Sequence, residues 1–308
     1  MPACKFNLER DPPVYMCGEK VVGYVEVTFV KDRLLEDIRI IFRGMATVSW
    51  VDTMTRFPKL YSGEETYMEM ETIVFQGGPL LADTYRYNFY FHVPDVCPTT
   101  CTTDIGKIFC ELIVLVSFEN EGKSKFPTEI MVIQTFDIEK VPNAMLPVEC
   151  SDEMFFCCWP CAAGPVAVYL KSARYAYIPG NTIEFSIGLT NKSKRFKFRT
   201  TLTTYLIQIY KYIAEEPRHR SRYISYILNS VKKHIIVESG DIAVLDDQFS
   251  VPPLPPSTQG NHIISIKYEL RLEIRINAVS RSTTSLDLPI VIGTSVESAA
   301  AHTVLVNK

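Results

Sequence analysis

Hydrophobic and polar residues alternate along most of this chain. The clearest run covers residues 264–276, where every second residue is apolar and most residues between them are charged. Residues 85–93 alternate in the same way. Successive side chains of a β-strand point to opposite faces, so these runs predict strands with one face in a core and one in water. With similar runs at 21–29, 38–43 and 182–190, the pattern predicts an all-β fold of immunoglobulin-like antiparallel sandwiches.

The segment 203–231 is the best candidate for a helix, although its apolar spacing fits neither a helix nor a strand cleanly. Pro217 lies inside the charged cluster EEPRHR and would break a helix there. We therefore predict two strands joined by a hairpin turn at this cluster. In the whole chain we expect at most one short helix.

The most apolar run, residues 108–118, is too short to cross a bilayer and contains Glu111. A membrane-spanning helix needs about 20 apolar residues, so this run predicts a buried strand. The first eleven residues carry four charges and lack the apolar stretch of a secretory signal. We expect a cytoplasmic protein whose cysteines are reduced.

Two stretches of the chain repeat in the same order. Tyr15 and Gly18 in the first half align with Tyr177 and Gly180 in the second, and FHVPDVCPTT (91–100) aligns with FSVPPLPPST (249–258). Two matches at nearly the same offset predict tandem copies of one sandwich. We place the first domain at residues 1–143, a linker at 144–161, the second domain at 162–297 and a short tail at 298–308.

Composition narrows the classes of partner. The 308 residues are 47% hydrophobic and 22% charged, with a formal net charge of −3. A nucleic-acid-binding protein usually has a basic excess on one face, so no nucleic-acid partner is expected.

Several motifs together resemble the arrestin-domain-containing proteins, the α-arrestins, from about residue 5 to about residue 296. The motifs are Tyr15 with Gly18-Glu19 and the strand from Val21, GMATVSW (44–50), Cys157-Cys158-Trp159 with Cys161 and Gly164-Pro165, Tyr177-Ile178-Pro179-Gly180, and LDLPIVIGT (286–294). The resemblance implies two tandem arrestin-like sandwiches. It also implies a non-catalytic adaptor in endocytosis and sorting of receptors or transporters, whose partners are cytoplasmic regions of membrane proteins. Recruitment to the plasma membrane or endosomes would follow from such a role.

Two departures from the family pattern stand out. Asn181 occupies a turn position where the family usually has Glu. Family members also commonly carry a long tail with PPxY motifs that recruit HECT-type ubiquitin ligases through WW domains. The printed chain ends at Lys308 with no such motif after the second domain, and we expect a short form.

Three cysteines, Cys157, Cys158 and Cys161, cluster at the junction between the halves. A zinc site needs about four ligands, and no second pair follows the CxxC spacing, so we expect no metal. A disulfide between adjacent cysteines has poor geometry. S-acylation and simple packing beside aromatic residues both remain open, and packing is favoured. No cofactor is expected.

The segment PPVY, with Pro12, Pro13 and Tyr15, satisfies the PPxY motif that WW domains bind. Val14 and Tyr15 also lead into the first strand, and a motif paired in a sheet cannot enter a WW groove. We favour the structural interpretation and expect weak or absent binding of WW domains to the folded chain.

A basic run precedes the predicted hairpin in the second half: Lys192, Lys194, Arg195, Lys197 and Arg199. It is a candidate contact for anionic lipid or phosphate. A solvated hairpin is the favoured alternative, because no apolar anchor flanks the run.

Three classes of function remain open at this stage. The first is the trafficking adaptor, with or without recruitment of a ubiquitin ligase. The second is an arrestin-fold scaffold that binds coat or sorting-complex subunits. The third is a cysteine hydrolase using Cys158 or Cys110, for which no Cys/His/Asn arrangement is present, so we expect no enzyme.

Overall fold

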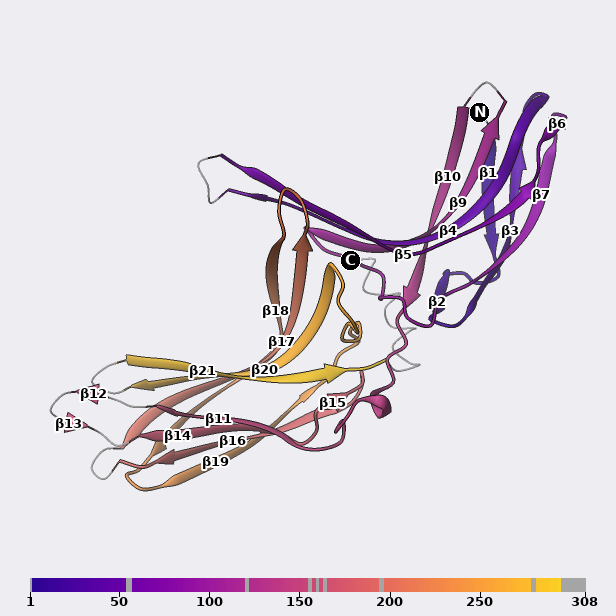
Figure 1. Cartoon of the computed structure of the whole chain (residues 1–308). Helices are drawn as coiled ribbons and strands as arrows, with labels where there is room; N and C mark the ends of the chain where they lie inside the picture. Colours follow the sequence, from indigo (N-terminus) through magenta and orange to yellow (C-terminus); the bar gives the residue numbers. More distant parts are fainter. Residues whose placement is uncertain are drawn as a thin grey trace.

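The computed structural model shows two β-sandwiches joined through a short central connection (Figure 1). The structure describes residues 2–53, 57–119, 122–154, 157–158, 161–162, 165–193, 197–277 and 281–294. Most strand pairs within it are antiparallel. The predicted all-β fold of two tandem antiparallel sandwiches is confirmed.

The first sandwich packs a three-stranded sheet, in the order β1-β3-β7, against a larger one, in the order β2-β10-β9-β4-β5. Two short strands extend the larger sheet, β6 pairing with β4 and β8 with β9. The strands are β1 (Ala3–Leu8), β2 (Val14–Met16), β3 (Lys20–Thr28), β4 (Arg33–Asp52), β5 (Lys59–Phe75), β6 (Gly78–Leu80), β7 (Thr84–His92), β8 (Cys101–Thr102), β9 (Gly106–Phe118) and β10 (Gly122–Ile133).

Alternate residues of these strands form one core between the two sheets. Val25 of β3, Phe42 of β4 and Val114 of β9 are fully buried, and Phe91 packs its ring 5.7 Å from that of Phe42. Burying one such side chain stabilises a fold by roughly 1.5–3 kcal/mol. The apolar run at 108–118 falls within β9, as predicted.

The second sandwich packs a four-stranded sheet, in the order β11-β14-β16-β19, against a five-stranded one, in the order β15-β21-β20-β17-β18. The strands are β11 (Val148–Met154), β14 (Val166–Ser172), β15 (Ala176–Tyr177), β16 (Thr182–Asn191), β17 (Phe198–Ala214), β18 (Arg220–Val237), β19 (Ile242–Ser250), β20 (Ile264–Asn277) and β21 (Arg281–Ile292). A separate two-stranded piece pairs β12 (Cys157–Cys158) with β13 (Cys161–Ala162).

The alternating run of 264–276 is β20, and its apolar residues are all buried. The segment that a helix could have occupied is instead the hairpin of β17 and β18, with the charged cluster at its turn, which confirms the prediction. Even-numbered residues of β17 are buried from Phe198 to Ala214. The one register shift with β18, between Leu206 and Ile207, leaves Leu228 of β18 as the extra residue.

The connection between the domains is shorter than the sequence suggested. β11 pairs with β14 from Val148↔Ser172 to Met154↔Val166, so residues 148–154 belong to the second sandwich although they fall inside the expected linker 144–161. The sequence of β11, VECSDEM, is polar because the strand lies at a sheet edge, where only one side is paired, and for that reason it was not predicted as a strand.

The one helix in the described ranges is a single 3-10 turn, η1 (Ile138–Lys140), which Asp137 caps through its side chain. Within these ranges no helix has the length and apolarity that a bilayer crossing requires.

Candidate functional site

A tyrosine-glycine turn occurs once in each domain with the same hydrogen bonds. In the first copy Gly18 donates to Val93 and Val93 donates to Glu19 through their backbones. In the second copy Gly180 and Val251 make the equivalent bonds, the latter to Asn181. Both glycines have positive φ, 84° and 89°, a region that favours glycine. The repeat read from the sequence is thus a repeat of structure.

Each turn is preceded by a short strand that pairs in parallel with the last strand of its domain. Tyr15 in β2 lies opposite Val132 in β10, and Tyr177 in β15 lies opposite Ile292 in β21. The tyrosines are 1% and 2% exposed. Each tyrosine therefore anchors a short strand from the earlier part of its sandwich to the closing strand.

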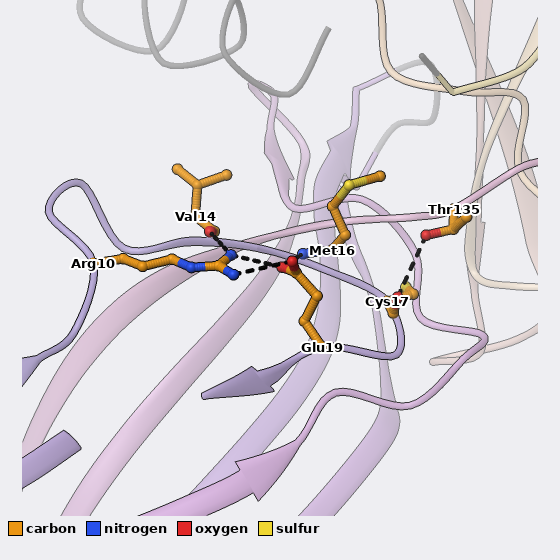
Figure 2. Close-up of polar contacts among 6 residues, drawn as sticks. All are labelled: Arg10, Val14, Met16, Cys17, Glu19 and Thr135. Carbon is orange, nitrogen blue, oxygen red and sulfur yellow. Dashed lines mark hydrogen bonds and ion pairs between the residues drawn. The ribbon is translucent and has the colours of Figure 1, made fainter. Parts of the chain in front are cut away.

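Arg10 and Glu19 brace the first turn (Figure 2). The Arg10 guanidinium donates to both carboxylate oxygens of Glu19 at 2.6 and 3.0 Å and to the Val14 carbonyl at 3.0 Å. The same Glu19 carboxylate accepts the Met16 amide at 2.7 Å. Arg10 also lies over the Tyr15 ring, 4.9 Å from its centroid. We call Arg10, Glu19 and the backbone they hold the N-terminal brace.

The second turn lacks this brace but satisfies its tyrosine more fully. The Asn181 side-chain oxygen accepts a hydrogen bond from the Ile178 backbone amide at 3.2 Å, so the Asn181 side chain takes the place of the family's usual glutamate. The Tyr177 hydroxyl is 2.8 Å from the Ser172 hydroxyl and accepts the Arg174 amide at 3.1 Å. The Tyr15 hydroxyl, in contrast, is buried with no hydrogen-bond partner among the described residues. The first anchor is therefore less well satisfied than the second.

The charges of the brace act on each other. The hydrogen bond from Arg10 lowers the pKa of Glu19 below its usual value, and the bond to Glu19 raises the pKa of Arg10. Burial raises the pKa of the Tyr15 hydroxyl. Glu19 is consequently ionised in the folded protein at neutral pH.

The PPxY segment is part of this arrangement. Pro12 is exposed, Pro13 is half-buried and Tyr15 is in the core, while Met131 donates its amide to the Pro13 carbonyl at 2.9 Å. The three residues of the predicted WW-domain motif thus lie together, the two prolines just before β2 and the tyrosine within it, and the tyrosine side chain is buried. Binding of a WW domain stays a prediction.

Some residues of the basic run, but not all, have ion-pair partners within the chain. Lys194 and Arg195 lie outside the described residues. Lys192 pairs with Glu153, and Lys197 lies 3.7 Å from Glu238. Arg199 is exposed on β17. Two of the five cations therefore have carboxylate partners within the chain, and contact with lipid or phosphate stays a prediction.

The side chains of Cys157, Cys158 and Cys161 lie outside the described part of the chain. Among the side chains described, no three His, Cys, Asp or Glu residues are grouped so as to hold a metal ion. Burial raises the pKa of Cys4 to about 12 and that of Cys101 to about 11, which keeps these thiols protonated and poorly nucleophilic. Cys110, considered for a hydrolase, is buried and its thiol pKa is also raised, first by a hydrogen bond with Cys97.

A polar seam joins the two domains, and sequence reasoning did not find it. Arg220, at the start of β18, forms an ion pair with the buried carboxylate of Asp52 at the end of β4. Arg220 and Arg218 also donate to the Tyr61 hydroxyl at 3.1 and 3.3 Å. These bonds, from Arg220 first, lower the pKa of Tyr61. The hairpin turn of the second domain is thus fastened to the β4-β5 hairpin of the first.

The backbone completes this contact. Ser62 donates its amide to the Glu216 carbonyl and accepts amides from Glu215 and Glu216, all at 3.0 Å. A Cβ at Gly63 would lie 3.1 Å from the Ile213 carbonyl, so glycine permits the close approach.

A second group of seam contacts lies on β5 and the end of β21. The Glu65 carboxylate is 2.7 Å from His262 Nδ1 and accepts the Ile263 amide at 2.9 Å. The Tyr212 hydroxyl is 2.9 Å from Thr103 Oγ1 across the same boundary. Thr294 donates its hydroxyl to the Gln134 carbonyl and accepts the Phe136 amide. Together with the contacts of Arg220 and Ser62, these bonds hold the two domains at four separate places.

Comparison with known families agrees with this architecture. Residues 4–139 match the family model described as arrestin (or S-antigen), N-terminal domain, and residues 162–297 match the one described as arrestin (or S-antigen), C-terminal domain.

Individual relatives are distant but similar over most of this chain. Arrestin domain-containing protein 17 of Caenorhabditis elegans is 22% identical over 298 residues, which cover 91% of this chain and 67% of that protein. Arrestin domain-containing protein 15 of the same organism is 24% identical over 201 residues, covering 63% of this chain and 53% of the relative. Thioredoxin-interacting protein of Sus scrofa is 23% identical over 297 residues, covering 92% and 72%.

The arrestin domains are non-catalytic scaffolding folds and indicate an adaptor-like role. With both domain types present in tandem and joined by the seam, the chain belongs to the arrestin-domain-containing family.

Proposed function

We propose that this protein is a non-catalytic cytoplasmic adaptor in membrane-protein trafficking. It would bind cytoplasmic regions of receptors or transporters and direct them into endocytosis or sorting, moving to the plasma membrane or endosomes when it engages them. Membership of the arrestin-domain-containing family supports this role.

The observation that carries the proposal is the pair of arrestin domains held in one arrangement by the seam. An adaptor has to bind two partners at once, so it gains from two surfaces at a fixed separation. The seam supplies this through Arg220 with Asp52, Glu65 with His262, and Thr294 with Phe136.

Recruitment of a HECT-type ubiquitin ligase would use Pro12, Pro13 and Tyr15. In the folded chain this segment is paired with β10, so recruitment requires β2 to leave the sheet. The N-terminal brace is the group that opposes this release.

The pairing of β2 favours a second candidate function. An arrestin-fold scaffold that binds coat or sorting-complex subunits without a ligase needs no exposed PPxY segment. The same two domains and the same seam would serve it.

Proximity labelling in cells separates these functions. The wild-type chain, its Arg10→Ala variant and an unrelated cytoplasmic protein would each carry the labelling enzyme. Labelled membrane proteins together with WW-domain ligases, the ligases increased by Arg10→Ala, support the ligase adaptor. Labelled coat subunits without ligases support the scaffold. Labelling no richer in membrane or coat proteins than the unrelated control contradicts both.

A further inference from the structure

β18 is an open edge of the five-stranded sheet. The sheet order ends at β18, and in the described part of the chain no strand pairs with its other side over its 18 residues. Its outward N–H and C=O groups can therefore accept another extended segment. β18 is also visible as the outer strand of its hairpin in Figure 1.

The two halves of this edge differ in how they are protected. The second half carries Lys232 and Lys233, and it begins after a bulge at Leu228. Lysines and bulges are the usual means by which proteins block an edge strand. The first half, residues 221–228 (SRYISYIL), has one charge. Tyr223 and Ile227 are 62% and 63% exposed on it.

The sheet face beside this edge carries unpaired positive charge. The register places Lys211 beside Tyr223 and Lys232 beside Thr203, and Arg275 lies one strand further, beside Thr201. None of these three cations has an ion pair among the described residues.

The acids on the same face are engaged by their own neighbours. Arg271 holds both Glu269 and Asp287. Glu273 accepts a hydrogen bond from Tyr205 and keeps its negative charge, which offsets one of the three cations. The charge left for a partner at this edge is therefore positive.

We propose that the β18 edge binds an extended, acidic segment of a partner protein, which adds to the sheet as a sixth strand. Apolar residues of the segment would face Tyr223 and Ile227, and its acidic residues would face Lys232. This inference rests on the proposed adaptor function, because it names the surface that such an adaptor would use.

A second copy of the chain fits the edge less well. Its β18 would bring its own Lys232 to the face that already carries Lys211, Lys232 and Arg275, and like charges opposite each other in a sheet are destabilising. An acidic strand has the opposite effect, since oppositely charged cross-strand pairs are stabilising.

The test uses the full chain and two synthetic peptides. The first has three glutamates followed by alternating valine and threonine, because antiparallel addition places the start of the peptide beside Lys232. The second has three lysines in place of the glutamates. Binding is measured by fluorescence anisotropy, and the site is located by hydrogen exchange.

We expect the glutamate peptide to bind about fivefold more tightly than the lysine peptide, the size of one favourable cross-strand charge pair. Lys232→Glu should reverse this preference, whereas Lys125→Glu on β10 should leave it unchanged. Ile227→Lys should weaken both peptides, and its matched control, Ile242→Lys on the β19 edge, should not. Protection from exchange should increase at residues 221–228.

The inference is overturned if Lys232→Glu and Lys125→Glu behave alike, or if protection increases elsewhere and not on β18. Concentration-dependent dimerisation that Ile227→Lys abolishes would assign the edge to a second copy. Binding to anionic vesicles that Lys232→Glu abolishes, without peptide binding, would assign it to a membrane. If the peptides bind as expected but proximity labelling in cells finds no excess of membrane or coat proteins, the trafficking function is rejected and β18 is still a binding edge.

Discussion

Tyr15 and Tyr177 occupy equivalent positions in two copies of one turn, yet their hydroxyl groups differ. Tyr177 has two hydrogen-bond partners, whereas Tyr15 has none in the described part of the chain. An unsatisfied buried hydroxyl costs free energy, while a satisfied one stabilises the fold by a modest amount. The internal repeat therefore provides a matched pair for measuring what this hydroxyl contributes.

Tyr15→Phe should change the free energy of unfolding by less than about 0.5 kcal/mol, or raise it, because the removed hydroxyl has no partner to lose. Tyr177→Phe should lower it by about 1–3 kcal/mol, because the Ser172 hydroxyl and the Arg174 amide lose their partner. Urea unfolding with domain-resolved hydrogen exchange would measure both. Equal losses in the two variants would show that the two anchors are energetically alike.

Glu19 makes the first domain sensitive to acid. Its pKa is lowered by the hydrogen bond from Arg10, so its stabilising contribution is complete above the usual glutamate pKa of 4.5 and is lost as pH falls through the lowered value. Glu19→Gln should therefore be less stable than wild type near neutral pH. The difference between them should shrink as pH falls through the lowered pKa of Glu19, as followed by hydrogen exchange of β2 and β10. A constant difference across this range would contradict a role for the Glu19 charge.

β2 shows how a three-residue strand can decide the use of a linear motif. Its pairing with β10 keeps Pro12, Pro13 and Tyr15 in a sheet, although a PPxY segment has to be free to enter a WW groove. Release would give up several backbone hydrogen bonds, each worth about 0.5–1.5 kcal/mol, and the burial of Tyr15.

Isolated WW domains should therefore bind the intact chain weakly or not at all, and bind a free peptide of residues 8–18 more tightly. Arg10→Ala should move the intact chain toward the peptide, since it removes the bonds to Glu19 and Val14. Titration of chain, variant and peptide against a WW array measures the three affinities. An intact chain that binds as tightly as the peptide would mean that the segment is already free.

Strands were predictable from the sequence where one face is buried and the other is wet. The alternation in β20 and β7 and the Tyr-Gly repeat identified the elements and the duplication. β11 was not recognised because it lies at a sheet edge and carries Glu149, Asp152 and Glu153. Apolar and polar residues alternate because one face of a strand is buried, so a strand with little buried surface shows little alternation in its sequence.

The seam between the domains could not be read from the sequence at all. Asp52, Tyr61 and Arg220 come from three strands of two domains, and their contact depends on how the sandwiches dock. The cluster EEPRHR was identified as a turn, but a turn sequence does not indicate which surface it touches. The Arg10 partner of Glu19 was missed for the same reason, because loop conformation brings the two together.

Across the whole molecule, Arg220 should couple the stabilities of the two domains. Arg220→Ala leaves the largely buried Asp52 carboxylate and the Tyr61 hydroxyl with fewer partners, so we expect a lower free energy of unfolding and less cooperative unfolding of the domains. Arg222→Ala, two residues along β18 and without an ion pair in the described chain, is the control and should be nearly neutral. Calorimetry would resolve one transition from two. Unchanged cooperativity in Arg220→Ala would mean that the remaining contacts hold the domains together without it.

The parallel pairing of β2 and β15 with the last strands of their domains also sets an order of assembly during translation. Residues 14–16 wait for residues 131–133, and residues 176–177 wait for residues 291–292, before either sandwich is complete. A nascent chain therefore leaves the ribosome with PPVY uncovered, and its accessible period ends when β10 emerges. The second sandwich remains open until residues 291–292 have been made, and Thr294 then fastens it to Phe136 and Gln134 of the domain made first.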